Sequence, residues 1–267
     1  MTSHLVSGAS GYLGSNIIKH LVKLKHNVVS FDVIRDDKIA KISNFYKVDI
    51  TDKNSLEKIF KENKIDYIHH NAALVPLTKQ DNKYMTVNYG GTKNILELAS
   101  KYQIKHFSHM SSSAIFGNNN YLHKKVDTNS YNPIGKYGYS KYLAEIEVLK
   151  SNLDQNCKIG SISIIRPRPV IGKGRLGIFE ILFDWIDSDC NIPIIGDGTN
   201  RFQFAHVDDL SQVSIETAIG GINGIFNIGT DKFTNLKNDL EEFIKIIGSN
   251  VKIIKTKTYF IVNLLRI

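Results

Sequence analysis

Cysteine is scarce in this chain of 267 residues, where only Cys157 and Cys190 occur. Zinc sites in proteins use closely spaced cysteine and histidine ligands, and these two cysteines have no such spacing. Two cysteines in a chain of this size indicate a reducing compartment. We therefore expect no metal site and a cytoplasmic protein.

Long apolar runs are also missing. The sequence contains no stretch of 18 apolar residues, which is about the length that a membrane-spanning helix needs. The first residues lack the charged, apolar and small-residue sections of a secretory signal, because a glycine-rich turn already begins at Gly8. We expect a protein that neither enters a membrane nor carries a leader segment.

Arginine is rare among the positive charges, although the formal net charge is +8. Lysine far outnumbers the six arginines, and no arginine-rich stripe or nucleic-acid-binding motif occurs. A basic surface attracts anionic substrates, but a lysine-rich solvated surface explains the charge equally well. We expect no nucleic-acid partner.

Strands and helices are predicted to alternate along most of the chain. Its length suffices for one large domain with a smaller lobe, and alternation of this kind is typical of a parallel sheet with helices on both faces. Strands are predicted near 3–7, 27–32, 45–48, 66–70, 104–110 and 159–165, and helices near 12–24, 52–63, 79–101 and 136–152. After Arg166 the pattern becomes irregular, although 202–207 and 224–229 read as strands that return to the main sheet, and Asp208 or Asp209 is expected to cap a helix over 210–219.

A glycine-rich turn follows the first predicted strand and opens the first predicted helix. Its sequence is Gly8-Ala-Ser-Gly11-Tyr-Leu-Gly14. Gly8 permits a tight turn, Gly11 lets the backbone approach a pyrophosphate, and Gly14 lets the helix pack closely on the strand. The free N–H groups at the start of the helix favour phosphate binding. The spacing differs from the commoner Gly-x-Gly-x-x-Gly, but its strand–turn–helix context predicts a dinucleotide site.

An aspartate ends the second predicted strand. Asp32 follows Gly14 by 18 residues, close to the spacing expected for the acid that binds the adenine ribose hydroxyls. A carboxylate there repels a 2′-phosphate, which favours NAD. Arg35 lies close enough in the sequence to receive that phosphate, so NADP stays an alternative.

A tyrosine and a lysine lie four residues apart in Tyr137-Gly-Tyr-Ser-Lys141. On a helix these side chains share one face and can meet. An isolated tyrosine has a pKa near 10, and a nearby ammonium group lowers that pKa toward the range of a useful base.

With these motifs in place, the chain resembles the extended short-chain dehydrogenase/reductase family, specifically its NAD-dependent sugar epimerase/dehydratase group, from residue 3 to about 230. Further segments match in order: Asp49-Ile50, Asn71-Ala72-Ala73, Asn88, and Ser111 to Gly117. The resemblance implies a doubly wound, parallel-sheet α/β Rossmann domain with a small, interleaved substrate lobe. It places the first domain at 1–165 with 201–229 and the lobe at 166–200 with 230–267.

The resemblance also implies roles for individual residues. Ser112, Tyr137 and Lys141 would be catalytic, with Ser112 found by counting back five residues from Gly117. Tyr137 would act as the base, Ser112 would bind the same substrate oxygen, and Lys141 would hold the nicotinamide ribose. The residues expected to bind the cofactor are Gly8, Ser10, Gly11, Tyr12, Leu13, Gly14, Asp32, Asp49, Ile50, Asn71, Ala72, Ala73, Asn88, Tyr137, Lys141 and Pro167.

The lobe departs from the family pattern. Pro169 stands where epimerases such as UDP-galactose 4-epimerase carry an asparagine that touches the substrate phosphates. Phe202 occupies the position of the family's diphosphate-binding arginine, and Arg201 lies one residue earlier, which on a strand points to the other face unless a bulge intervenes. We expect Ser112, Ser113, Arg168 and Arg201 to contact substrate. Family members usually continue for several dozen residues beyond this length, so either the lobe is minimal or the sequence is truncated.

Three functions remain open. The first is a nucleotide-sugar epimerase that works through a keto intermediate, the second a reductase or dehydrogenase of a small carbonyl or alcohol, and the third a non-catalytic dinucleotide-binding protein. The complete set of Ser112, Tyr137 and Lys141 argues against the third. A 4,6-dehydratase would carry Asp-Glu after the active serine, where this chain has Ser113-Ala114. The resemblance also implies a homodimer through helices 79–101 and 136–152.

Overall fold

The computed structural model describes residues 1–76, 81–117, 131–174 and 178–256. The chain divides into two compact units. The first unit comprises Met1–Arg168 and Val207–Ile228, and the second comprises Pro169–His206 with the residues from Gly229 onward. Residues 201–206 and 229, which the sequence analysis grouped with the first domain, thus lie in the second unit, whereas 166–168, which it grouped with the lobe, lie in the first.

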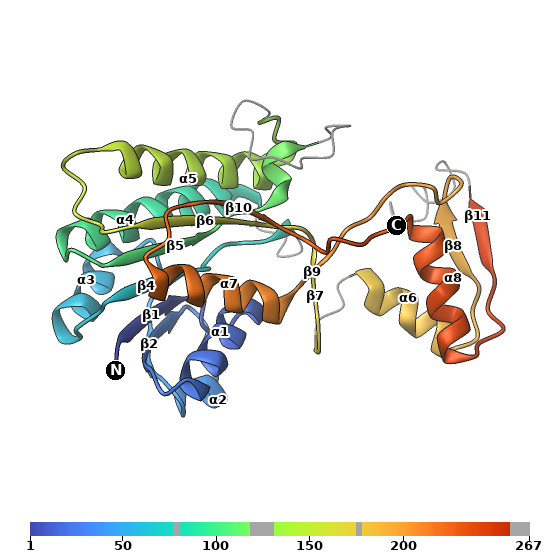
Figure 1. Ribbon diagram of the computed structural model, residues 1–267, viewed down its shortest axis with the longest axis horizontal. Helices are drawn as coiled ribbons and strands as arrows, with labels where there is room; N and C mark the ends of the chain where they lie inside the picture. The colour runs from blue at the N-terminus through green and yellow to red at the C-terminus, as the bar shows by residue number, and fades with distance from the viewer. Residues whose placement is uncertain (77–80, 118–130, 175–177, 257–267) are drawn as a thin grey trace. The chain divides into compact units, whose positions relative to one another are not determined.

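A seven-stranded parallel sheet forms the centre of the first unit (Figure 1), which confirms the predicted fold class. The strand order is β10-β6-β5-β4-β1-β2-β3. The strands are β1 (Ser3–Ser7), β2 (Asn27–Asp32), β3 (Asn44–Lys47), β4 (Tyr67–His70), β5 (His106–Met110), β6 (Ile162–Pro167) and β10 (Gly224–Ile228). The direction of strand addition reverses between β1 and β4, and the carboxyl ends of strands at such a reversal form the usual binding crevice of this architecture.

Helices cover both faces of the sheet (Figure 1). The short helix α2 (Asp37–Ala40), α1 (Tyr12–Lys23) and α7 (Val207–Gly220) lie on one face, where Ile17, Leu21 and Ile215 join one apolar cluster. Helices α3 (Lys53–Glu62), α4 (Gly91–Lys101) and α5 (Gly135–Leu153) lie on the other, and Ile95 and Val148 belong to its larger cluster. Burial of these apolar side chains supplies the main driving force for folding.

The interface between the central strands and α7 contains polar contacts beside the apolar contacts of Ile215. His69 forms hydrogen bonds with His4 of β1 (2.9 Å) and with Ser214 of α7 (2.8 Å). Ser214 also bonds Ser108 of β5 (3.0 Å). These four side chains are buried, and each has a hydrogen-bond partner, as buried polar groups require. The Ser214 hydroxyl of α7 therefore satisfies one ring nitrogen of the strand histidine His69.

Two predicted elements differ in the structure. The helix expected over 79–101 begins outside the described residues, and its described part consists of a 3₁₀ turn (Asp81–Lys83), a π-helical turn (Met85–Gly90) and then α4. The interruption coincides with Asn88, whose side chain reaches into the loop after β4. Helix α7 starts at Val207, so Asp208 and Asp209 lie inside its first turn rather than at its cap.

The strand expected over 202–207 does not return to the main sheet. Only β9 (Ala205–His206) forms, and it pairs in parallel with β7 (Val170–Ile171) inside the second unit. The strand expected over 224–229 is β10, which pairs with β6 as predicted. The two segments have similar local sequence patterns. They join different sheets because sheet membership depends on partners far away in the sequence.

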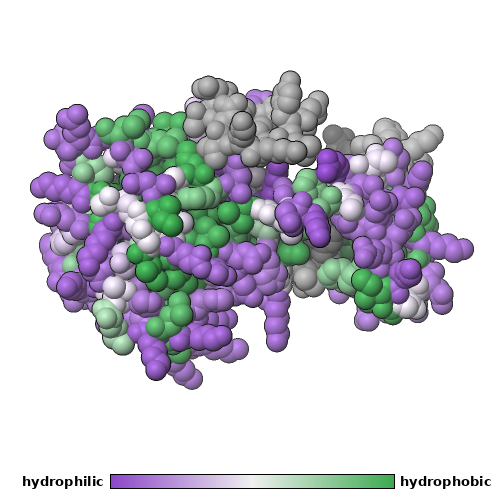
Figure 2. Space-filling view, viewed as in Figure 1, coloured by the Kyte–Doolittle hydropathy of each residue, from purple (hydrophilic) through white to green (hydrophobic). Residues whose placement is uncertain are grey.

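The second unit has its own core. Strands β8 (Ile192–Ile195) and β11 (Ile253–Thr256) form a parallel pair beside α6 (Ile178–Asp187) and α8 (Leu236–Ile247). The buried residues of this core are Ile186, Ile192, Ile194, Leu240 and Val251. Hydrophilic and hydrophobic residues are interspersed on the face drawn in Figure 2.

In the described part of the chain, no helix is both long and apolar enough to cross a membrane.

Candidate active site

The glycine turn lies at the carboxyl end of β1, beside the loop after β4. Gly8 has a φ of +69°, and a Cβ atom there would lie 2.9 Å from the backbone nitrogen of Ala72. A Cβ atom on Gly14 would lie 2.0 Å from the Gly8 carbonyl oxygen. Two of the three glycines are therefore required by close backbone contacts, one between neighbouring loops and one within the turn.

The start of α1 fits a phosphate group. Its N-cap, Gly11, has no side chain to cap the helix, and its first turn contains no acidic residue. The first N–H groups of such a helix lack intrahelical acceptors and carry the positive end of the helix dipole. Tyr12 and Leu13 begin the helix, and Leu13 packs against the apolar cluster below it, so backbone N–H groups rather than side chains are presented.

Asp32 is brought to the glycine turn by hydrogen bonds. Its carboxylate accepts from the backbone N–H groups of Ser10 (3.0 Å) and Ile34 (3.2 Å), and the Ser10 hydroxyl donates to the Ile34 carbonyl (2.6 Å). Arg35 instead pairs with Asp37 (3.1 Å). The structure thus joins Ser10 and Asp32, two of the residues that the sequence analysis expected to bind the cofactor.

The loop after β4 is fixed from β1. The Ser7 hydroxyl accepts from the backbone N–H groups of Asn71 and Ala72, both at 3.0 Å. Ala73 follows in the same half-buried stretch, and the Asn71 side-chain oxygen is buried without a hydrogen-bond partner among the described residues. This loop therefore offers a polar acceptor next to Gly8, consistent with a segment that runs along a cofactor.

Asp49 and Ile50 lie after β3. The Asp49 carboxylate accepts from the backbone N–H and the hydroxyl of Thr51 (2.9 and 2.8 Å). Ile50 is buried and fills the space above Gly91, where a Cβ atom would lie 2.5 Å from the Ile50 side chain. Backbone carbonyls of this turn accept from Asn94, so the turn is anchored on α4.

Asn88 links two parts of the site. Its side chain accepts from the Leu74 N–H (2.7 Å) and donates to the Leu74 carbonyl (3.1 Å) and the Ser140 hydroxyl (3.0 Å). Ser140 in turn donates to the Tyr137 carbonyl (2.8 Å). The buried amide thus connects the loop after β4 with the beginning of α5.

Lys141 is buried at the centre of the site. Its Nζ donates to the Met110 carbonyl at the end of β5 (2.6 Å). Burial lowers the pKa of Lys141 to about 8, and the negative charge of Glu145 opposes part of that shift. Tyr137 lies one turn earlier on α5 and is half-buried, with its ring 5.9 Å from that of Tyr84.

Ser112 follows β5 by two residues. Its hydroxyl caps a short 3₁₀ turn (Ser113–Phe116) by accepting from the Ala114 N–H (3.1 Å). Because Lys141 holds α5 against Met110, the segment of Ser112 and Ser113 lies at the same end of β5 as the lysine. The structure thus brings the three expected catalytic residues to one end of the sheet.

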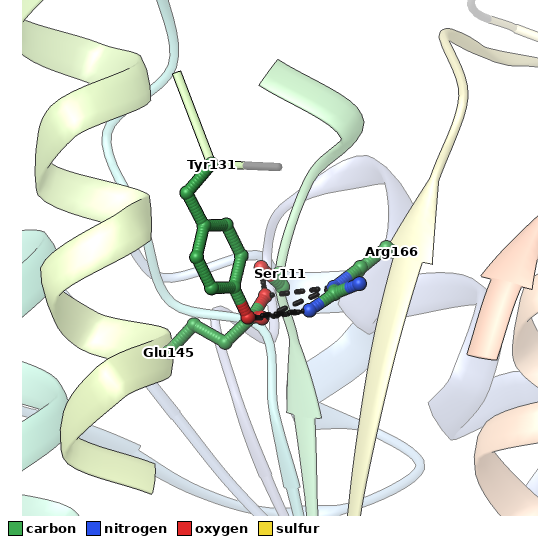
Figure 3. Close-up of polar contacts among 4 residues, drawn as sticks. All are labelled: Ser111, Tyr131, Glu145 and Arg166. Atoms are coloured by element: carbon green, nitrogen blue, oxygen red, sulfur yellow. Dashed lines mark hydrogen bonds and ion pairs between the residues drawn. The ribbon is translucent and has the colours of Figure 1, made fainter. Parts of the chain in front are cut away.

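A buried charged network beside these residues was missed by the sequence analysis (Figure 3). Glu145 of α5 and Arg166 of β6 form an ion pair in which both side chains are fully buried. Arg166 Nε and Nη2 donate to the carboxylate, and the hydroxyls of Ser111 (2.5 Å) and Tyr131 (2.8 Å) donate to it as well. Two features of the sequence could have indicated this network: Glu145 follows Lys141 by one helical turn, and Arg166 lies inside an apolar strand.

The residues expected to bind substrate lie in different units. Arg168 follows Pro167 at the end of β6, where its N–H donates to the Ile228 carbonyl (2.9 Å) and burial lowers its pKa. Arg201 belongs to the second unit, and its guanidinium lies 4.6 Å from the ring centroid of Phe233. A substrate contact by either arginine stays a prediction.

Comparisons with known proteins agree with this architecture. The sequence model of the NAD dependent epimerase/dehydratase family matches residues 4–229. An uncharacterised protein of Sinorhizobium fredii, y4nG, is 34% identical over 254 residues, which cover 93% of this chain and 62% of that protein. A putative UDP-glucose 4-epimerase of Methanocaldococcus jannaschii is 32% identical over 255 residues, covering 90% of this chain and 81% of that protein. The chain thus spans less than two thirds of the rhizobial relative.

Solved structures share the fold. The UDP-glucose 4-epimerase of Thermotoga maritima, solved with UDP-glucose, superposes with a TM-score of 0.84 at 24% identity and covers 96% of this chain and 86% of its own. That of Thermus thermophilus, solved with NAD, gives a TM-score of 0.81 at 20% identity, with the same two shares of 96% and 86%. The family match, rather than these identities, decides the assignment: the chain belongs to the NAD-dependent epimerase/dehydratase family of enzymes, whose cofactor is NAD.

Proposed function

We propose that the protein is an NAD-dependent epimerase of a nucleotide-diphosphate sugar. The observation that carries this proposal is the burial of Lys141 at the end of β5, one helical turn from Tyr137 and beside the segment of Ser112. This places a positive charge, a phenol and a hydroxyl at the same end of the sheet as the glycine turn. Such a set can move a proton to and from a sugar hydroxyl.

In the proposed reaction, Tyr137 as a phenolate accepts the proton of the sugar hydroxyl. The Lys141 ammonium favours that phenolate, and the Ser112 hydroxyl donates a hydrogen bond to the same substrate oxygen. NAD, when bound, would supply the hydride acceptor for the sugar carbon and would give the hydride back to the opposite face. Tyr137 then gives the proton back. The configuration at that carbon is inverted, and the sugar is neither oxidised nor reduced overall.

Residues of the first unit would hold the cofactor. The uncapped start of α1 would bind the pyrophosphate, and Asp32 would accept from the adenine ribose hydroxyls. Lys141 and Tyr137 would contact the nicotinamide ribose. The remaining contacts proposed for the cofactor are those of Gly8, Ser10, Tyr12, Leu13, Asp49, Ile50, Asn71, Ala72, Ala73, Asn88 and Pro167.

The substrate diphosphate would be held by arginine. The planar guanidinium group binds two phosphate oxygens at once, which lysine does not do. Arg201 or Arg168 is the proposed donor, and Ser113 is the proposed neighbour of the sugar.

One observation favours the alternative of a reductase acting on a small carbonyl or alcohol. Pro169 begins the second unit and has no side-chain donor, although its carbonyl accepts from the Ala205 N–H (3.0 Å). A reductase releases its cofactor in every cycle, whereas an epimerase keeps it because the hydride must return.

The test is the cofactor content of the purified protein, followed by assays with UDP-glucose, dTDP-glucose and GDP-mannose. We expect bound NAD and the formation of a sugar epimer with no net change in NADH absorbance. A protein that binds none of UDP, dTDP or GDP at millimolar concentration, yet exchanges NAD freely, would establish the reductase instead.

A further inference from the structure

We infer that the buried ion pair of Glu145 and Arg166 positions Ser112 and Lys141 for their proposed catalytic roles. This inference rests on the proposed function, because it concerns how the proposed catalytic residues are held. Neither residue of the pair is proposed to touch substrate or cofactor.

The first support is the helix face. Tyr137, Lys141 and Glu145 follow one another at intervals of four residues on α5, so they lie along one face over two turns. Glu145 is therefore the residue directly behind Lys141 on the side away from Tyr137. Any shift of α5 that moves the carboxylate moves the lysine and the tyrosine with it.

The second support is the bond to Ser111, the residue before Ser112. The Ser111 hydroxyl donates to Glu145 Oε2 (2.5 Å), and its backbone N–H donates to the Ile165 carbonyl of β6 (2.7 Å). Ser111 is thereby fixed through both its backbone and its side chain. Because one peptide unit joins it to Ser112, this fixation sets where the chain leaves β5 and where the backbone of Ser112 lies, and the Ala114 N–H then orients the Ser112 hydroxyl.

The third support is the way that Arg166 is enclosed. Its guanidinium lies 5.1 Å from the ring centroid of Phe116 and 5.4 Å from that of Tyr131, and Nη2 donates to the Tyr131 hydroxyl (2.7 Å). The pair therefore ties together α5, the segment after β5 and the end of β6 (Figure 3). Removal of one partner would leave an uncompensated buried charge, which is far more disruptive than the loss of a surface ion pair.

The fourth support is electrostatic. Three charged groups, those of Lys141, Glu145 and Arg166, are buried together. Without the carboxylate, burial would act unopposed on Lys141 and its pKa would fall below about 8. The other titratable groups that face Lys141 are the buried rings of His70 on β4 and His109 on β5, whose pKa values are lowered by burial and by the lysine, so they supply no negative charge in place of Glu145. Glu145 thus favours the charged form of Lys141.

The first experiment compares two serine variants of β5 and its end. Ser111→Ala removes the hydroxyl that binds Glu145, whereas Ser108→Ala removes an equally buried hydroxyl that binds Ser214 on the other face of the sheet. We expect Ser111→Ala to lower kcat by about 10-fold or more with NAD affinity unchanged, because small misplacements of reacting groups are costly. Ser108→Ala should keep kcat. Equal kcat in the two variants would overturn the positioning of Ser112.

The second experiment measures NAD affinity by calorimetry from pH 6 to 10 in the wild type and in Glu145→Gln. The affinity should fall as Lys141 loses its proton, and Glu145→Gln should move that fall to lower pH by about one unit. Glu145→Asp should restore part of the shift. A purely structural role would lower the melting temperature without moving the pH profile, and an unmoved profile in folded Glu145→Gln would overturn the electrostatic part.

Tyr137→Phe separates this inference from the proposed function. If Tyr137→Phe turns over like the wild type, the proposed catalytic roles fail whatever the other variants do. If it is inactive while Ser111→Ala and Glu145→Gln keep the wild-type kcat and pH profile, the positioning inference alone fails.

Discussion

At the scale of single residues, short backbone contacts and single polar atoms govern the site. Gly14 lies against the Gly8 carbonyl, Asp32 holds the glycine turn by its carboxylate, and Lys141 is bound by one carbonyl at the end of a strand. Substitutions here should therefore separate cofactor binding from chemistry.

Tyr137→Phe should lower turnover by about 10²–10⁴-fold while NAD affinity changes little, because only the proton-transfer hydroxyl is lost. Turnover with UDP-glucose and calorimetry with NAD check the two parts. Tyr139→Phe is the matched control, since Tyr139 lies on the same helix and is 50% exposed. Near-normal turnover of Tyr137→Phe would remove the catalytic assignment.

Gly14→Ala should weaken NAD binding strongly and lower the free energy of unfolding by about 2 kcal/mol or more, because its Cβ would overlap backbone that cannot move independently. Gly90→Ala is the control, since its Cβ would meet only a carbonyl oxygen at 3.8 Å. Thermal unfolding and NAD titration of both variants measure the difference. Similar losses in both would show that Gly14 has no special packing role.

NAD should bind more tightly than NADP, by about tenfold or more, because the Asp32 carboxylate repels a 2′-phosphate. Asp32→Asn should narrow the gap by improving NADP binding. Titration of each protein with each cofactor measures both effects. Equal or tighter binding of NADP to the wild type would instead assign the cofactor preference to Arg35.

At the scale of elements, local signals predicted more than long-range ones. The helix from Tyr12 and the strands on either side of it were predicted to within about one residue. Their signals, glycine spacing and apolar periodicity, depend only on residues that are close together in the sequence. The ion pair of Glu145 and Arg166 could not be predicted in this way, since its partners lie 21 residues apart on different elements. An isolated glutamate on a helix usually indicates a solvated face.

The histidine-rich strands bear on stability at low pH. Burial lowers the pKa of His4 and of His70 to about 3 and that of His106 to about 4. These groups are neutral in the folded protein but charge near pH 6.5 when unfolded. Their contribution is therefore complete above pH 6.5 and is lost as the pH falls toward 3 to 4.

We expect the free energy of unfolding to drop by about 2 kcal/mol for each histidine of pKa near 3 between pH 7 and 5. Urea unfolding at pH 5, 6, 7 and 8 measures this slope. His70→Asn should flatten it, whereas His20→Asn, at a half-exposed surface position, should not. A stability independent of pH across this range would contradict the role assigned to the buried rings.

At the scale of the whole molecule, the second unit is the less predictable part. Its pairs β7–β9 and β8–β11 join segments about 35 and 60 residues apart, and its helices α6 and α8 were not anticipated. Residue periodicity alone does not say which short strands will pair. The proposed roles of Arg168 and Arg201 therefore depend on experiment rather than on pattern.

We expect a homodimer formed through α4 and α5, with about twice the chain mass of 30.1 kDa in light scattering. Ser151→Arg, which places a long charged side chain in the groove between these helices, should shift the mass to that of a monomer. Ser188→Arg, in the second unit, is the control. A wild-type mass of 30.1 kDa at all concentrations would contradict the dimer.

The path of the chain has a consequence for its synthesis. Helix α7 and strand β10 belong to the first unit, yet they are made after residues 169–206 of the second. Until they leave the ribosome, β6 has an open edge, and His69 and Ser108 lack their partner Ser214. The first unit therefore cannot complete its sheet until residues 169–206 have been translated. A ribosome that stalls within that segment holds an incomplete sheet, whose open strand edge and exposed apolar surface are recognised by chaperones and proteases.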